Sequence, residues 1–213
     1  MSEEHKDTKQ AIIEAAGELF AESGVDAVGI RTIAEKAGVN IAAVNYHFGN
    51  KENLSVEIFR YIVTRSCKRR IPDIIEALGE SPSRAELAAA IRGVIEAMFE
   101  TFVNQGNPDW HDRYSLRVLL RPAEPFHQVM KEHFLPEHEA LKRLALLARP
   151  GLDEDRATAL ALSFNAHAAF YFLAREPLEL MLGDRFDRGY FQNAVKQVVS
   201  TYLSAFGLGE YAS

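Results

Sequence analysis

Two short groups of acidic and histidine residues have the spacing that catalysis or metal binding would need: Glu132-His133 and Glu137-His138-Glu139. In a helix, His133 and Glu137 would lie one turn apart and could act as metal ligands or as an acid–base pair. Pro136 stands between them and is expected to disrupt this geometry. The sequence contains no His-Glu-x-x-His motif, glycine-rich phosphate loop or Gly-x-Ser-x-Gly elbow. We therefore expect no enzymatic activity, metal or cofactor, and we interpret these charges as a solvent-facing surface.

A second group of side chains, over residues 41–48, has the types that recognise DNA. If these residues form a short helix, Val44 and Phe48 fall one turn apart and would pack inward. The opposite face would then carry Ile41, Ala42, Asn45, Tyr46 and His47. An amide such as Asn45 can pair with adenine through two hydrogen bonds, or it can hold a phosphate. The apolar start Ile41-Ala42-Ala43 favours contact with thymine methyl groups, although Ile41 could equally pack inside its own domain.

The charge of the chain is unevenly distributed. The net charge is −6, whereas binding to DNA phosphates requires basic side chains. Between residues 30 and 70, however, the basic residues outnumber the acidic ones: Arg31, Lys36, Lys51, Arg60, Arg65, Lys68, Arg69 and Arg70 against Glu35, Glu52 and Glu57. In this positive segment, Arg31 and Thr32 precede the outward face and Lys51 follows it. We expect these three residues beside the phosphates that border the groove.

These residues must be positioned by helices, and the spacing of apolar residues predicts where the helices lie. Apolar residues recur at three- and four-residue steps over residues 8–23, and Gly24 is expected to end that helix. Short helices are predicted over residues 30–37 and 41–48, with Gly38 between them and Asn40 as the N-cap of the second. Two short helices across a glycine turn form a helix-turn-helix pattern, whose second helix enters the major groove.

The rest of the chain is also predicted to be helical, with no convincing strand and no internal repeat. A long helix is expected from residue 51 toward residue 78, bent or interrupted at Pro72. Ser83 and Glu86 predict a capping box at the head of a helix that reaches about Asn104. Further helices are predicted over residues 109–121, 124–148, 153–174, 177–182 and 187–206.

The segment over residues 28–54 resembles the signature of the TetR family, the tetracycline-repressor-like transcriptional regulators. It combines Ile33-Ala34-x-x-Ala37-Gly38-Val39, the ending Tyr46-His47-Phe48 of the recognition helix and the opening Lys51-Glu52 of the next helix. The resemblance covers residues 8–60 by motif. It implies that Tyr46 and Lys51 hold phosphates, and that the other matched positions lie at or near the DNA: Arg31, Thr32, Ile41, Ala42, Ala43 and Asn45. Asn45 departs from the aromatic residue that is common at its position.

The resemblance also implies an all-α fold, with an N-terminal three-helix DNA-binding domain over residues 1–53 and a larger helical ligand-binding and dimerisation domain over residues 54–213. The second part is acidic and rich in aromatic residues, which suits an apolar cavity. The candidate ligand contacts are Phe99, Phe102, Trp110, Tyr114, Arg117, Phe126, Met130, His167 and Tyr171. Aromatic stripes are also the ordinary content of a bundle core, so each residue has that alternative. His167 and Asn165 need polar partners because their helix is otherwise apolar.

The function that the resemblance implies is that of a homodimeric repressor, which leaves a palindromic operator when a small apolar or aromatic effector binds. The subunits would pair through residues 153–174 and 187–206. Two apolar stripes suit this pairing: Ala161, Phe164, Ala168 and Phe172, and Val195, Val198, Val199, Tyr202 and Phe206. A helical protein that binds DNA or a partner without sensing a ligand is the alternative.

The sequence predicts a cytoplasmic protein. Its first residues lack a basic segment followed by an apolar one, so no secretory signal is expected. The uncharged stretch over residues 157–174 contains Thr158, Ser163, Asn165 and His167, which fits a buried bundle helix better than a membrane span. Cys67 is the only cysteine, so an internal disulfide is excluded.

Overall fold

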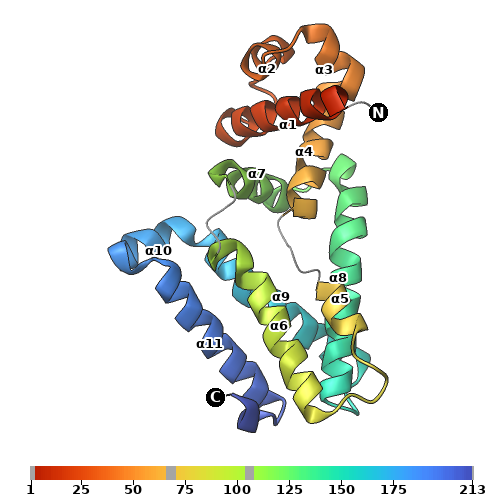
Figure 1. Ribbon diagram of the computed structural model, residues 1–213, viewed down its shortest axis with the longest axis vertical. Helices are drawn as coiled ribbons and strands as arrows, with labels where there is room; N and C mark the ends of the chain where they lie inside the picture. Colours follow the sequence, from red (N-terminus) through yellow and green to blue (C-terminus); the bar gives the residue numbers. More distant parts are fainter. Residues whose placement is uncertain (1–2, 66–70, 104–107, 213) are drawn as a thin grey trace. The chain divides into compact units, whose positions relative to one another are not determined.

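The computed structural model describes residues 3–65, 71–103 and 108–212 (Figure 1). Within these ranges the regular secondary structure is entirely helical, which confirms the all-α prediction. The chain forms two compact units: unit 1 joins residues 1–66 to 107–132, and unit 2 joins residues 67–106 to 133–213. The division predicted from the sequence, after residue 53, separates a DNA-binding domain from a ligand-binding and dimerisation domain. That division stays a prediction.

Unit 1 begins with α1 (Glu3–Ser23), α2 (Ile30–Ala37), α3 (Ile41–Phe48) and α4 (Lys51–Arg65). It also contains α7 (Asp109–Leu120), the short helix η1 (Glu124–Phe126) and the first residues of α8 (His127–Ala148). The predicted bounds of α2 and α3 are confirmed, and α1 begins at Glu3 instead of residue 8. Gly38 ends α2 with a φ of 68°, a backbone conformation that favours glycine.

The core of unit 1 is a layer of aliphatic and aromatic side chains shared by α1, α2, α3, α4 and α7. Fully buried members are Ile12, Phe20, Ile33, Leu54, Ile58 and Phe59. Gly17 brings α1 close to α7, because a Cβ atom at this position would lie 2.2 Å from Trp110 Cζ3. The indole of Trp110 therefore occupies the space that a side chain on α1 would need.

Polar side chains complete the anchoring of α7. The hydroxyl of Tyr114 donates to the carbonyl of Ser55 at 2.7 Å, and it lies 2.6 Å from Ser55 Oγ. The guanidinium of Arg117 donates to the carbonyls of Ala21 and Glu22, both at 3.0 Å. These carbonyls belong to the last turn of α1, whose acceptors have no partner within the helix. Thus α7 holds both α1 and α4.

Unit 2 contains α5 (Ile71–Glu76), α6 (Arg84–Val103), the remainder of α8, α9 (Glu154–Leu173), α10 (Arg175–Leu182) and α11 (Arg188–Ala205). Two short helices, η2 (Gly183–Arg185) and η3 (Gly209–Tyr211), follow α10 and α11. A helix was predicted from residue 51 toward residue 78, with a bend or an interruption at Pro72. The described residues form two separate helices, α4 and α5, and Pro72 lies in the first turn of α5, where proline is tolerated.

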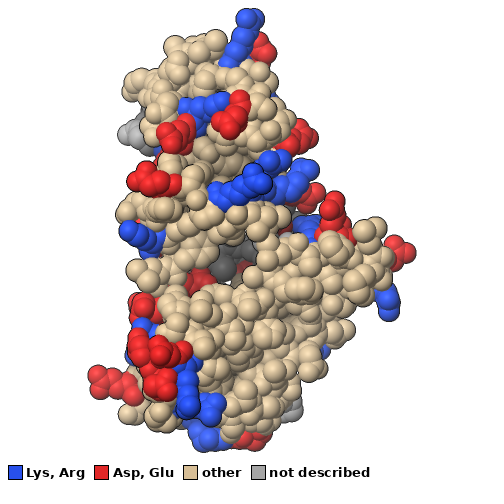
Figure 2. Space-filling model, turned by 180° about the vertical axis from the view of Figure 1, so that it is seen from behind, with Lys and Arg blue, Asp and Glu red and all other residues tan. Residues whose placement is uncertain are grey.

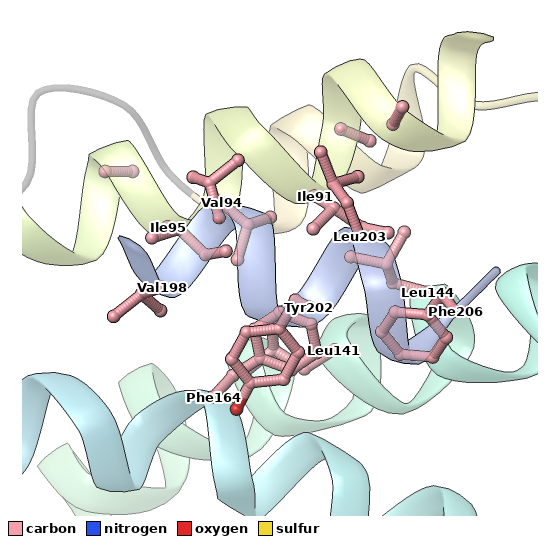
Figure 3. Packing of buried hydrophobic residues seen from close by; sticks show 14 of the residues in the cluster. Ile91, Val94, Ile95, Leu141, Leu144, Phe164, Val198, Tyr202, Leu203 and Phe206 are labelled. Carbon is pink, nitrogen blue, oxygen red and sulfur yellow. The ribbon is translucent and has the colours of Figure 1, made fainter. Parts of the chain in front are cut away.

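The core of unit 2 is formed by α6, α8, α9 and α11 (Figure 3). Its labelled members are Ile91, Val94, Ile95, Leu141, Leu144, Phe164, Val198, Tyr202, Leu203 and Phe206. The rings of Phe164 and Tyr202 stack with centroids 4.1 Å apart. The hydroxyl of Tyr202 reaches Ser163 Oγ at 3.0 Å, so the polar end of this buried phenol is satisfied.

The predicted helix caps are present. The side chain of Asn40 accepts a hydrogen bond of 2.8 Å from the Ala43 N–H. Ser83 and Glu86 form the reciprocal capping box, with the Ser83 N–H donating to Glu86 at 2.7 Å and the Glu86 N–H donating to Ser83 Oγ at 3.2 Å.

One expectation about α8 was wrong. The helix continues through Pro136 from His127 to Ala148, so His133 and Glu137 do lie one turn apart. Proline removes one backbone donor, but the flanking turns and the burial of Leu141 and Leu144 sustain the helix. Among the described residues, no His, Cys, Asp and Glu side chains group as metal ligands would.

In the described part of the chain, no single helix is long and apolar enough to cross a membrane. One bent pair of segments, residues 154–171 and 175–185, reaches such a length and composition only when the two are counted together.

Candidate functional site

The outward face of α3 has the composition and the exposure of a recognition surface. Val44 and Phe48 are buried, and they belong to the same core cluster as Ile33 and Ala34 of α2. On the other side, Ala42 and Asn45 are exposed, and Ile41 and Tyr46 are 45% and 76% exposed. The predicted inward and outward faces are therefore both present, and Ile41 is not buried inside its own unit.

Two further predicted DNA contacts on α3 are half-buried, Ala43 and His47. The imidazole of His47 meets the ring of Tyr46 edge-on, with centroids 5.3 Å apart. It also packs at a tilt against the buried ring of Phe48. His47 thus contacts both the exposed phenol of Tyr46 and the buried ring of Phe48.

Arg31 and Thr32, in the first turn of α2, are both exposed. Arg31 Nε donates to Glu35 Oε1 at 3.0 Å, one turn along the same helix. An ion pair this exposed contributes little to stability, so the guanidinium can turn toward another anion at small cost. Both residues keep the accessibility that a phosphate contact needs.

Lys51 has partners within its own unit. Its Nζ donates to the carbonyls of Asp26 and Val28, at 3.3 Å and 3.1 Å, and its side chain is half-buried. These bonds tie the first residue of α4 to the loop between α1 and α2. A phosphate contact by Lys51, which stays a prediction, would have to share or replace them.

The excess of positive charge predicted for residues 30–70 is reduced by acidic residues of other helices. Lys36 pairs with Glu18 of α1 at 2.6 Å, and Arg60 pairs with Glu132 of α8. Figure 2 shows Lys and Arg next to Asp and Glu in several places on the face that it draws, most of which is formed by other residues. Three other basic residues of the segment, Lys68, Arg69 and Arg70, lie outside the described residues, as does Cys67.

The predicted ligand contacts divide between the two units. Trp110, Tyr114, Phe126 and Met130 lie in or against the core of unit 1. Phe126 meets Phe59 edge-on, with centroids 5.8 Å apart, and burial raises the pKa of the Tyr114 phenol. Arg117 caps α1 as described above. All five have structural partners in unit 1, and their contact with a ligand stays a prediction.

Three other predicted ligand contacts lie in unit 2. Phe99 is buried, and its ring meets Tyr171 edge-on at a centroid distance of 5.2 Å. Burial and a hydrogen bond with Tyr190 raise the pKa of Tyr171 to about 12. His167 Nδ1 lies 2.9 Å from the Ser163 carbonyl and 3.2 Å from the Tyr202 hydroxyl, so its polar partners are within the chain. The side chain of Phe102 lies outside the described residues.

Glu137 was interpreted as part of a solvent-facing surface, but its side chain is half-buried. It lies four residues before Leu141 and seven before Leu144, two fully buried residues of α8. This spacing marks the inner face of a helix and was present in the sequence. The expectation that Pro136 would disrupt the local geometry led to the other interpretation.

The apolar stripes predicted for the subunit interface lie largely in the core of unit 2, as stripes that can pack against more than one neighbour allow. Ala161, Phe164, Val198, Val199, Tyr202 and Phe206, assigned to the subunit interface, are buried in the core of unit 2. Phe172 is among the side chains that are not described. The exposed apolar residues of α9 lie on another stripe: Leu162, Phe170 and Leu173, each more than half exposed. Pairing through α9 and α11 stays a prediction.

Comparison with known families accounts for both parts of the chain. Residues 12–58 match the family model of bacterial regulatory proteins of the tetR family. Residues 87–209, more than half of the chain, match the model of the C-terminal domain of the HTH-type transcriptional dual regulator CecR.

Two curated proteins illustrate the similarity. The HTH-type transcriptional dual regulator CecR of Shigella flexneri is 30% identical over 140 residues, which are 64% of this chain and 62% of that protein. The HTH-type transcriptional repressor AcnR of Corynebacterium diphtheriae is 26% identical over 126 residues, 59% of this chain and 56% of that protein. The matched region thus spans about three fifths of the length of these relatives.

Solved structures share the fold at low sequence identity. A transcriptional regulator from Pseudomonas aeruginosa has a TM-score of 0.66 at 17% identity, over 99% of this chain and 94% of that one. The SmeT–triclosan complex has a TM-score of 0.62 at 17% identity, over 93% and 90% of the two chains. With its N-terminal and C-terminal parts both matched by regulator models, the protein belongs to the TetR family of bacterial transcriptional regulators.

Proposed function

We propose that the protein is a ligand-responsive transcriptional repressor that binds a palindromic operator as a homodimer and leaves it when a small molecule binds. The observation that carries the proposal is the face of α3, where Ile41, Ala42, Asn45 and Tyr46 are exposed above the buried residues Val44 and Phe48. A recognition helix needs this combination of a fixed base and accessible side chains. Action on operator DNA would place the protein in the cytoplasm.

Two copies are needed because one short helix reads only one half-site. In a symmetric dimer, two α3 helices would lie about 34 to 36 Å apart, or at a related spacing, and would meet successive major grooves. The exposed stripe Leu162, Phe170 and Leu173 on α9 is one apolar surface suited to such pairing. Large exposed apolar patches mark interaction sites in proteins of this size.

The effector would act by population shift: it would favour the conformation in which the two recognition helices are wrongly spaced. The position of α7 supports a connection between the effector region and α3. This helix belongs by sequence to the predicted effector part, yet Tyr114 and Arg117 attach it to α4 and α1 in unit 1. A displacement of α7 would therefore move the helices on which α3 rests.

The test is a binding measurement on DNA fragments from the neighbourhood of the protein's own gene. We expect one fragment to bind at least about a thousandfold more tightly than unrelated DNA of equal length. A double variant, Asn45→Ala with Tyr46→Ala, should lose this preference, whereas Ala89→Ser on the exposed side of α6 should retain it. Binding of all fragments with equal affinity would contradict the proposal.

Release of the protein from the same fragment is tested with a panel of small molecules that were first shown to bind the protein in the absence of DNA. A ligand that lowers operator affinity must itself bind more weakly to the protein–DNA complex, because the coupling free energy is reciprocal. If compounds bind the protein but none changes its operator affinity, the protein is a DNA-binding member of the family that does not sense a ligand.

A further inference from the structure

The first turn of α7 contains a buried histidine, His111, whose side chain is only 5% exposed. Its Nδ1 atom is buried and has no hydrogen-bond partner in the part of the chain that the structure describes. A neutral imidazole can leave one ring nitrogen without a proton, whereas an imidazolium carries a donor on both nitrogens. Protonation of His111 would therefore bury a charged donor that no described side chain accepts, which costs free energy.

Charged and titratable side chains approach His111 from both neighbouring helices. Tyr61 of α4 meets the imidazole edge-on at a centroid distance of 5.9 Å, and Arg65 lies 5.0 Å from the centroid of the same phenol ring. From α1, Glu14 accepts a hydrogen bond of 3.1 Å from the Tyr61 hydroxyl. Burial and Arg65 lower the pKa of His111, and Glu14 offsets them only in part. The nearest charged residues in sequence lie on α7 itself: Asp109, Asp112 and Arg113.

The imidazole also contacts the residue that fixes α7 to α1. The rings of His111 and Trp110 meet edge-on with centroids 4.2 Å apart. The indole of Trp110 in turn fills the space beside Gly17 of α1. One turn later, Tyr114 attaches α7 to α4 through the Ser55 carbonyl. A movement of the His111 ring toward water would therefore disturb the packing that holds α7 on both helices.

The same core extends to the recognition helix. Trp110 belongs to one buried cluster with Phe48 of α3 and Leu54 of α4. Interiors this closely packed transmit a displacement from one side chain to the next. A conformation in which His111 is hydrated would therefore alter the support of α3, and a proton would favour that conformation because it binds more readily to the hydrated ring.

We propose that His111 is a proton-sensitive switch: uptake of one proton by its imidazole loosens α7 from α1 and α4 and lowers the affinity for operator DNA. The proton would act as a second signal, independent of the effector. This inference rests on the proposed operator binding and goes beyond it. Because coupling is reciprocal, operator binding to the protonated protein would release a proton.

The loosening of α7 can be followed without DNA, because Trp110 is the only tryptophan of the chain. Emission spectra of the full chain are recorded between about pH 8 and about pH 5.5, with circular dichroism showing that the helices persist. We expect the emission maximum of the wild-type protein to move to longer wavelength below pH 6.5, as the indole meets water. In His111→Gln and in His111→Phe, which keeps an aromatic ring at this position, the maximum should stay constant.

Operator affinity is then measured over the same range of pH. The wild-type protein should lose at least about fivefold in affinity, and a single proton limits the loss to about tenfold for each pH unit. His111→Gln and His111→Phe should each lose less than about twofold. His47 on α3 is present in all of these proteins, so its own titration does not affect the comparison.

The matched control is His127→Gln, the same substitution at the exposed start of α8 in the same unit. It should retain both the fluorescence shift and the loss of affinity. The inference is overturned if the wild-type emission maximum does not move, if both His111 variants still show the shift, or if they lose as much affinity as the wild-type protein. Absence of operator binding at every pH, with the fluorescence shift intact, would count against the repressor proposal and leave the proton response of α7 standing.

Discussion

Asn45 and Lys51 were both predicted to contact DNA, but they are held in different ways. Asn45 is exposed on α3, and its amide is available to a base edge or a phosphate. The ammonium group of Lys51 donates hydrogen bonds to two carbonyls of the loop between α1 and α2. Exposure therefore suits Asn45 to reading bases, and the loop contacts suit Lys51 to positioning the backbone of unit 1.

We predict that Asn45→Ala changes base preference at one position of each half-site, by about 1 to 3 kcal/mol. Lys51→Met should instead weaken binding to all operator sequences about equally and reduce the salt slope of the affinity by about one. Affinities for a set of single-base operator variants at several salt concentrations distinguish the two effects. An equal loss on every operator for Asn45→Ala would remove its reading role.

At the scale of helices, α7 holds α1 and α4 together in unit 1. It contacts α1 through Trp110 and Arg117, and α4 through Tyr114. The contact with α1 requires a residue without a side chain at position 17, because the indole of Trp110 fills that space. Helix packing this close leaves no room for even one methyl group.

Gly17→Ala is predicted to destabilise the protein by about 1 to 3 kcal/mol, because α1 and α7 must separate or Trp110 must leave its rotamer. The matched control is Gly93→Ala in α6, where the nearest atom would lie at an ordinary 3.6 Å. There, the gain in helix propensity should leave stability unchanged or raise it by up to about 1 kcal/mol. Urea unfolding of both variants provides the comparison, and equal effects would contradict the prediction.

The junction of α7 with α1 and α4 also contains a buried imidazole, that of His111. Its ring meets Tyr61 of α4 edge-on at 5.9 Å, and its Nδ1 has no hydrogen-bond partner among the described residues. Burial lowers its pKa, Arg65 lowers it further, and Glu14 opposes both. The neutral imidazole is the form that this junction stabilises.

Because the pKa of His111 in the folded state lies below its usual value of 6.5, the unfolded chain takes up the proton first as the pH falls. The stability contributed by His111 is therefore complete above pH 6.5 and is lost progressively at lower pH. Between about pH 8 and about pH 5.5, the wild-type protein should lose more unfolding free energy than His111→Gln. Equal losses in both proteins would show that another group is responsible.

At the scale of the whole molecule, the apolar stripe Leu162, Phe170 and Leu173 on α9 is one of the surfaces that the described residues leave exposed. The inner face of α9, with Ala161 and Phe164, is buried within unit 2. Two opposite apolar faces on one helix are typical of a helix that packs both within its own chain and against a second one.

We therefore predict that Leu162→Glu raises the dimer dissociation constant by about a hundredfold or more, since it removes an apolar contact and places a charge in the interface. Sedimentation velocity measures the change, and affinity for a palindromic operator should fall with it. Ala89→Glu, which adds the same charge on the exposed side of α6, should leave the dimer intact. An unchanged dissociation constant for Leu162→Glu would move the interface elsewhere.

The sequence by itself determined the helices and their caps, because these depend on residues within a turn or two of each other. Asn40 caps α3, Ser83 and Glu86 form their capping box, and the period of the apolar residues separates Val44 from Asn45. For the same reason the inward and outward faces of the recognition helix, and the family signature that it carries, could be predicted before any coordinates.

Only the tertiary structure decided which distant residues meet. The pairing of Lys36 with Glu18, the division of the predicted ligand contacts between two units and the half-burial of Glu137 all depend on how separate helices pack. A periodic pattern predicts that a helix has an apolar face, but it does not predict which other surface of the protein packs against that face. The partner is chosen by shape and volume across the folded chain, and these are properties of the assembly of helices rather than of any one segment.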